Sequence, residues 1–193
     1  MIFMNIRKYL LVSIGIIIII IATLGCVENN EEKETILTVN FGDYTIDYSL
    51  KDLESIDSYT GTGRYIKTKL LPDSVVIGES VSYTGVRMYK ILDEVPNLPG
   101  SFNISVVSSD EWQVTYSMDD IDGNVDIYDE EGNVLSNESA VMILAYKENG
   151  EYYSDIDPDG ETGPLRVAFV DNDVITSSNL WSKMVVSIEI LSI

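Results

Sequence analysis

The sequence contains no histidine and a single cysteine, Cys26, and both shortages restrict its chemistry. Without histidine, the chain has no Ser-His-Asp or Cys-His catalytic group and no His-based zinc or copper site. Cys26 has no second cysteine with which to form a disulfide inside the chain. Since Cys26 also follows directly on an apolar N-terminal segment, we expect no thiolate metal ligand and no redox pair in the rest of the protein.

Basic residues are also scarce, because 12 Lys and Arg stand against 32 Asp and Glu, for a formal net charge of −20. Residues 1–25 hold two of the basic residues, Arg7 and Lys8, and no acidic one, so the remainder carries a charge of −22. Such a charge repels nucleic acid and anionic lipid surfaces. We therefore expect no nucleic-acid partner.

The N-terminal 25 residues are typical of a secretory signal. Arg7 and Lys8 precede an apolar run over residues 9–24, and polar residues follow Cys26. The run is shorter than the roughly 18 apolar residues of a spanning helix. A cysteine at the cleavage point resembles a lipoprotein signal, although Thr23 stands where such signals usually carry Leu. We predict a lipidated Cys26, with an uncleaved membrane anchor as the alternative. Either places the domain at the cell surface, on the outer face of the cytoplasmic membrane.

The remaining sequence divides into a short acidic tether, residues 26–35, and one domain of globular composition, residues 36–193. Apolar and polar residues alternate over 37–41 and again over 44–48, which predicts two strands joined by a tight turn. Similar patterns predict nine or ten short strands and two or three short helices in all. The expected fold class is α+β, a sheet-dominated single domain with short helices at strand corners.

Three local signals mark corners and a central strand. Ser49 and Ser117 each precede a short helical pattern with an aspartate three residues later, which predicts helix N-caps. Residues 140–146 are apolar throughout, as expected of a strand buried on both faces. Asn149 and Gly150 both accept the positive φ angles of a type I′ hairpin turn.

Residues 82–92 read as the end of a strand that turns directly into a helix. Thr84 is expected to cap this helix with its hydroxyl. The spacing predicts one apolar stripe, made of Met88, Ile91, Leu92 and Val95.

Residues 58–63 contain two glycines and are interpreted as a loop. Loops of this kind cradle phosphate when a helix N-terminus follows, but here a strand follows. That strand is expected to place Tyr65 and Lys67 on one face and Ile66 on the other.

Five motifs occur in an order that resembles the oxidoreductase molybdopterin-binding domain of the sulfite oxidase family, in its small exported stand-alone form. The similarity covers roughly residues 42–191. The motifs are Tyr-Thr-Gly-Val-x-x-x-x-Ile-Leu at 83–92, Ser-x-Asp-x-Trp-x-Val-Thr-Tyr at 108–116, Ile-Leu-Ala-Tyr-Lys-x-Asn-Gly at 143–150, Gly-Pro-Leu-Arg-Val at 163–167 and Trp-x-Lys-x-Val at 181–185.

This resemblance implies a mixed-sheet domain with a cofactor cleft. The cofactor-binding positions that it implies are Tyr83, Thr84, Asp110, Trp112, Arg166 and Lys183. In the family, a cysteine ahead of the first motif ligates molybdenum and a histidine anchors the pterin. This chain has no cysteine over residues 61–82 and no histidine. Nor does it show a twin-arginine signal or a local basic cluster for the pterin phosphate.

We therefore expect that the fold is retained without molybdenum chemistry and without a cofactor. The interpretation is a binding module that takes a small ligand or a protein partner. The main alternative is a molybdopterin-dependent oxidoreductase in which a residue other than cysteine ligates the metal. A structural envelope protein without a ligand is the third possibility.

Two further motifs carry separate hypotheses. Asp155, Asp157 and Asp159 match the first half of a calcium-binding loop, but position twelve is Arg166 rather than Glu. The alternative for these aspartates is a solvated acidic loop. Asn137 and Asn103 each begin an N-glycosylation sequon, and Asn137 is the better acceptor because Asn103 leads a predicted strand.

Overall fold

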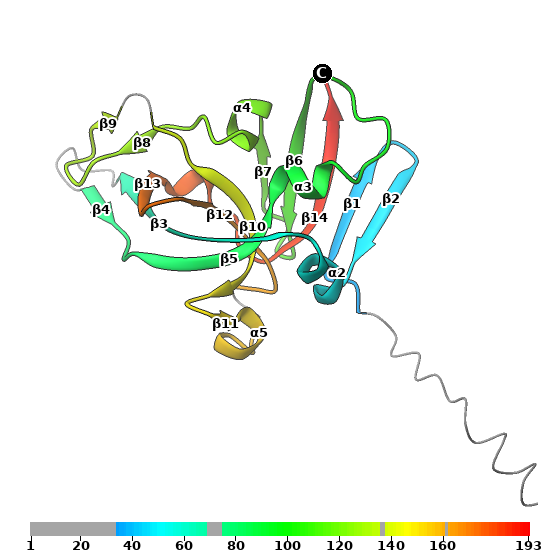
Figure 1. The fold of residues 1–193 in the computed structure, drawn as a ribbon, viewed down its shortest axis with the longest axis horizontal. Coiled ribbons are helices and arrows are strands. Elements are labelled where there is room, and N and C mark those ends of the chain that lie inside the picture. Colours follow the sequence, from blue (N-terminus) through cyan, green and yellow to red (C-terminus); the bar gives the residue numbers. More distant parts are fainter. Residues whose placement is uncertain (1–33, 69–74, 136–137, 161) are drawn as a thin grey trace, which may run out of the picture. The chain divides into compact units, whose positions relative to one another are not determined.

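The computed structural model describes residues 34–193 apart from 69–74, 136–137 and 161. Residues 1–33, including Cys26, and the sequon residue Asn137 lie outside the described residues. The described part folds into two β-sheets with short helices at the strand ends (Figure 1), as expected for a sheet-dominated α+β domain. None of the helices described has the length and hydropathy needed to cross a membrane.

The first sheet has five strands. In spatial order they are β2 (Tyr44–Tyr48), β1 (Leu37–Phe41), β14 (Val185–Ser192), β6 (Phe102–Ser108) and β7 (Gln113–Tyr116). The pair β1 and β14 is parallel, and the other neighbours are antiparallel. The sheet therefore unites the first and the last strand of the described domain.

The second sheet has nine strands. Its main path is β11 (Glu151–Tyr152), β10 (Val141–Glu148), β5 (Val81–Arg87), β3 (Ser58–Thr68), β13 (Val174–Ser177), β8 (Ile127–Tyr128) and β9 (Val134–Leu135). In addition, β12 (Arg166–Val170) pairs with β10, and β4 (Val75–Ile77) pairs with β3. As predicted, β10 is a central strand with five consecutive buried residues. Its hairpin turn has positive φ at both Asn149 and Gly150, which confirms that prediction.

Four short α-helices and one 3-10 helix occur among the described residues. They are α2 (Leu50–Ser55), α3 (Met88–Leu92), α4 (Met118–Ile121), α5 (Tyr153–Ile156) and η1 (Ser178–Leu180). The two predicted serine caps are confirmed, because the hydroxyls of Ser49 and Ser117 accept the N–H of the residue three positions later. In return, Asp52 and Asp120 accept the N–H of their serine at 2.9 and 2.7 Å.

The predicted cap at Thr84 is wrong. β5 continues to Arg87, which pairs with Ile143 of β10, so α3 begins at Met88 and has no side-chain cap. The Thr84 hydroxyl instead lies 2.8 Å from that of Thr60 on β3. Sheet pairing on both sides of β5 keeps the backbone extended for three residues beyond the predicted helix start. The predicted apolar stripe is nevertheless fully buried.

The predicted glycine-rich loop at 58–63 is also wrong, because β3 begins at Ser58. A Cβ atom on Gly63 would lie 2.4 Å from the carbonyl oxygen of Phe169, and one on Gly61 would lie 3.0 Å from Val170. Both glycines therefore allow β12 to pass close over β3. Because glycine has no side chain, Gly61 and Gly63 show no apolar and polar alternation, and the sequence pattern therefore did not indicate a strand. The strand β13 was missed as well.

One hydrophobic core joins the inner faces of both sheets. It includes Ile104 and Ile188 from the five-stranded sheet and Leu144 and Phe169 from the nine-stranded sheet. The two sheets are also linked by the backbone, because Val185 at the start of β14 donates its N–H to Leu165, next to β12, at 3.0 Å. This junction is where the candidate site lies.

Candidate functional site

A cavity of about 320 Å³ opens where the two sheets meet. Its walls come from β3, from the start of β12, from the β6–β7 connection and from the segment between η1 and β14. We call it the basic pocket. It is lined by Tyr65, Lys67, Ser108, Asp110, Trp112, Arg166, Ser178, Trp181, Lys183 and Met184.

The basic pocket brings together four of the six cofactor-binding positions that the family resemblance implied: Asp110, Trp112, Arg166 and Lys183. Tyr83 is buried behind the wall, where its ring lies 5.6 Å from the Arg166 guanidinium. Burial raises the pKa of Tyr83 to about 12, although the nearby Arg166 charge opposes the rise. Thr84 does not line the pocket.

Three cations converge here, Lys67, Arg166 and Lys183, although the sequence predicted no local basic cluster. That expectation is wrong because the three residues are far apart in the sequence and come together only through the packing of the two sheets. Desolvation, and then the positive charges of Arg166 and Lys67, lower the pKa of Lys183. The one acidic residue in the lining is Asp110, so the lining is net positive.

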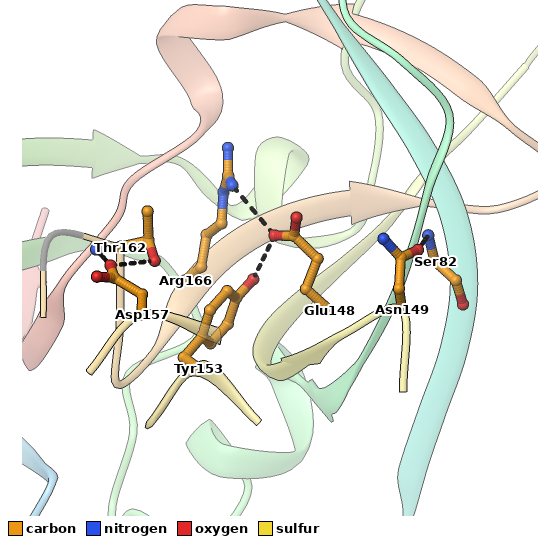
Figure 2. A network of polar contacts seen from close by, with 7 residues as sticks. All are labelled: Ser82, Glu148, Asn149, Tyr153, Asp157, Thr162 and Arg166. Carbon is orange, nitrogen blue, oxygen red and sulfur yellow. Dashed lines mark hydrogen bonds and ion pairs between the residues drawn. The ribbon is translucent and has the colours of Figure 1, made fainter. Parts of the chain in front are cut away.

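Arg166 is fixed from several sides. It begins β12, only 7% of its surface is exposed, and its Nη1 lies 3.6 Å from Glu148 Oε2. The hydroxyl of Tyr153 donates to the same oxygen at 3.4 Å (Figure 2), and burial raises the pKa of Tyr153 well above its usual value. The Arg166 guanidinium also lies 5.3 Å from the ring centre of Trp181. The ion pair with Glu148, which also accepts from Tyr153, therefore fixes the position of the Arg166 side chain.

The positive charge of Arg166 is only partly compensated. The 3.6 Å separation from Glu148 is longer than a hydrogen bond, and the Arg166 Nε is buried without a hydrogen-bond partner. A buried donor without a partner is costly. Guanidinium groups with free donors bind carboxylate, sulfate or phosphate oxygens strongly.

A second wall is the β6–β7 connection, which is tied to the segment before β14. The Ser108 hydroxyl donates to the carbonyl oxygen of Lys183, and the Ser109 N–H donates to that of Met184 at 2.9 Å. Within the connection, the Trp112 N–H donates to the Asp110 carboxylate at 3.1 Å. Glu111 and Met184 both have positive φ, a strained backbone state that is common at functional sites.

Trp181 forms the third wall. Its indole N–H donates to Thr176 Oγ1 on β13 at 2.8 Å. Its ring contacts Tyr65 and Tyr83 edge-on, with ring centroids 5.7 and 5.4 Å apart.

Sequence reasoning did not assign Tyr65, Lys67 or Trp181 to the site. The alternation in β3 was the available signal, because it places Tyr65 and Lys67 on one face.

The predicted calcium ligands lie on and just after α5. Asp155 is in the helix, Asp157 follows it, and Asp159 lies in the next turn. The Asp157 carboxylate accepts the N–H and the hydroxyl of Thr162 at 2.5 and 2.6 Å (Figure 2). No group of three or more acidic, cysteine or histidine side chains that could hold a metal ion occurs among the described residues. This geometry gives the calcium prediction no support.

Of the two sequons, only Asn103 falls within the described residues. It lies inside β6, opposite Leu191 of β14, and is half-buried in the five-stranded sheet. Its modification stays a prediction, as does that of Asn137.

The lining of the basic pocket also tests the fit of a molybdenum centre. It contains no cysteine and no histidine, and the Ser108 hydroxyl and the Asp110 carboxylate are already engaged by protein groups. These residues do not offer the soft thiolate donor that the family uses. The cations, in contrast, fit an anionic group.

Fold and site together define a sheet-dominated α+β domain with a small cationic pocket. The structure is similar to that of the sulfane dehydrogenase SoxCD from Paracoccus pantotrophus, with a TM-score of 0.55 and 15% sequence identity. The likeness covers 83% of this chain and 39% of the SoxCD chain, so this chain spans about two fifths of that protein. No family model and no curated protein matches the sequence. At this identity the likeness shows a shared fold and nothing about activity.

Proposed function

We propose that this protein is an exported, membrane-anchored binding module whose sulfite-oxidase-like domain holds a small anion in the basic pocket and performs no molybdenum chemistry. The observation that carries the proposal is the convergence of Lys67, Arg166 and Lys183 on one cavity that contains a single acidic residue.

Electrostatics supports an anionic occupant. The domain and its tether carry a charge of −22, yet three of their ten basic side chains share one cavity. Desolvation, and then the charges of Arg166 and Lys67, lower the pKa of Lys183. Like charges held together also raise the free energy of the empty pocket. A bound anion relieves this repulsion.

The export and anchoring part of the proposal rests on the sequence. A basic pair, an apolar run of limited length and Cys26 at its end are the features of a lipoprotein signal. The sulfite-oxidase-like part rests on the five ordered motifs and is supported by the fold that the chain shares with SoxCD.

One observation favours a second candidate, a molybdopterin-dependent oxidoreductase with non-cysteine ligation. A cationic pocket in a fold like that of SoxCD suits the phosphate of a pterin cofactor. The lining argues against it, since it offers no soft donor for the metal. Elemental analysis for molybdenum and tungsten in protein purified from its native host separates the two. Close to one metal atom per chain would support the oxidoreductase and overturn the proposal.

The direct test is a calorimetric titration of the full-length protein in detergent with inorganic phosphate at low ionic strength. We expect saturable binding with one site per chain, lost in the double variant Lys67→Met and Lys183→Met. The matched control is Lys51→Met, because Lys51 is an exposed lysine of α2 outside the pocket. Absence of binding, or equal loss in the control, would contradict anion binding at this site.

A further inference from the structure

Trp112 stands out among the residues of the basic pocket. The residue is 64% exposed, which makes it the most exposed aromatic residue in the described part of the chain. The other indole of the pocket, Trp181, is buried and packed against two tyrosines. Trp112 makes no ring contact with any described aromatic residue. A large apolar ring left open beside a cavity is a typical feature of a ligand-contact residue.

The backbone under Trp112 is held firmly. Its N–H donates to Asp110 and its carbonyl oxygen accepts the N–H of Ser108 at 2.9 Å. The same connection is bonded to the backbone of Lys183 and Met184, which also line the pocket. The exposed ring is therefore presented on a loop that is already ordered, so little conformational entropy is lost when a ligand packs against it.

The size of the cavity limits what can pack there. A volume of about 320 Å³ is at the lower end of the roughly 300–1,000 Å³ of small-molecule sites. One ring with one acidic substituent fits within this volume. Charged donors and an open indole in the same lining call for a ligand that is anionic at one end and flat at the other.

We infer that the ligand of the basic pocket is a single-ring aromatic acid, with its anionic group at Lys67, Lys183 and Arg166 and its ring against Trp112. This inference rests on the proposed function and adds the chemical class of the ligand. It assigns Trp112 a role in specificity, whereas the three cations supply charge recognition that any small anion can use.

The test compares three monoesters of equal charge, methyl, cyclohexyl and phenyl phosphate, by calorimetry on the full-length protein. We expect phenyl phosphate to bind about five- to hundredfold more tightly than methyl phosphate, since stacking on an aromatic side chain is worth about that range. Cyclohexyl phosphate, of similar size but not flat, is expected to lie closer to methyl phosphate. Quenching of indole fluorescence by the phenyl ester gives an independent signal.

Variants identify the residue that produces the preference. Trp112→Ala is expected to bring the ratio of phenyl to methyl phosphate affinity close to one, while Trp112→Phe retains most of the preference. The matched control is Tyr44→Ala, which removes another exposed aromatic side chain, on β2 and outside the pocket.

The outcomes separate the two proposals. Equal affinity for the three esters, or an advantage of the phenyl ester that survives Trp112→Ala, would overturn the aromatic ligand and leave anion binding standing. Failure of all three esters and of inorganic phosphate to bind would overturn the proposed function itself.

Discussion

Two cavities on opposite sides of β3 differ in charge although each contains an arginine. Successive residues of a strand point to opposite faces, so Tyr65 and Lys67 line the basic pocket while Arg64 faces a second cavity of about 620 Å³. We call the second cavity the acidic cavity. The acidic residues that line it are Asp129, Glu130, Glu131, Glu138, Asp171 and Asp173.

The two arginines are compensated differently. Arg64 lies 2.6 Å from Glu130 and 3.1 Å from Asp173, so two carboxylates neutralise its charge. Arg166 has one carboxylate, Glu148, at 3.6 Å, and two lysines share its cavity. Volume alone would select the acidic cavity as the ligand site. The comparison teaches that the balance of charge around an arginine, rather than the size of the cavity, decides whether it can receive an anion.

The largest expected effect comes from a change that disrupts both cavities. Gly63→Ala places a Cβ atom against the Phe169 carbonyl, which must move together with β12 and hence Arg166. We expect a loss of at least about 3 kcal/mol in the free energy of unfolding, as for other severe steric clashes. Thermal denaturation followed by circular dichroism measures it. Gly78→Ala is the control, since a Cβ atom there would make ordinary contacts with Tyr65, and equal melting of both variants would refute the explanation.

The next effect separates the two arginines. Arg166→Gln is expected to weaken phosphate binding about hundredfold, because it removes the buried member of the cation cluster. Arg64→Gln is expected to change phosphate affinity less than about twofold, since its charge is already neutralised by Glu130 and Asp173. Both are measured by calorimetry after melting curves confirm folding. A similar loss in both variants would mean that the charge balance does not distinguish the cavities.

A smaller effect concerns pH. The pKa of Lys183 lies below the usual lysine value, and an anion favours its protonated form. Affinity should therefore be constant below this pKa and fall by up to about tenfold as the pH rises through it. Sulfate is the suitable probe, because its own charge stays the same over this range. In Lys183→Arg the decline should disappear, since a guanidinium remains protonated; an unchanged profile would exclude Lys183 as the titrating group.

The smallest effect lies at the acidic cavity. Hydrogen bonds from the side chain and then the backbone of Asn133 lower the pKa of Asp129. A carboxylate with a lowered pKa stabilises the fold above its usual pKa and loses this contribution as the pH falls through the lowered value. Asp129→Asn should lower the melting temperature slightly at neutral pH and leave phosphate binding unchanged. A melting difference that persists in strong acid would point to another cause.

The elements that sequence reasoning identified depend on interactions within a few residues. The caps at Ser49 and Ser117 and the turn at Asn149–Gly150 are local, and the uninterrupted apolar run of β10 reports burial on both faces. Thr84 failed as a cap because the pairing of β5 with distant strands outweighed the local helix signal.

The sequence predicted only some of the residues that line the basic pocket. The family resemblance pointed to Arg166 and Lys183, which begin or precede strands of different sheets, but not to Lys67. Nothing local in the sequence joins these three cations, since their proximity depends on the register of β3 and on the way β12 crosses it. The glycines that permit this crossing were the same residues that made the strand look like a loop.

The parallel pairing of β1 with β14 determines the order in which the five-stranded sheet can form when the N-terminal part of the chain becomes available first. Until β14 arrives, the β1–β2 and β6–β7 hairpins have no common neighbour, and both expose unpaired edges. Lys183 and Met184 directly precede β14, so the basic pocket also lacks one wall until then. Resistance to proteases and the ability to bind an anion should therefore appear together, late and abruptly, when the last strand enters the sheet.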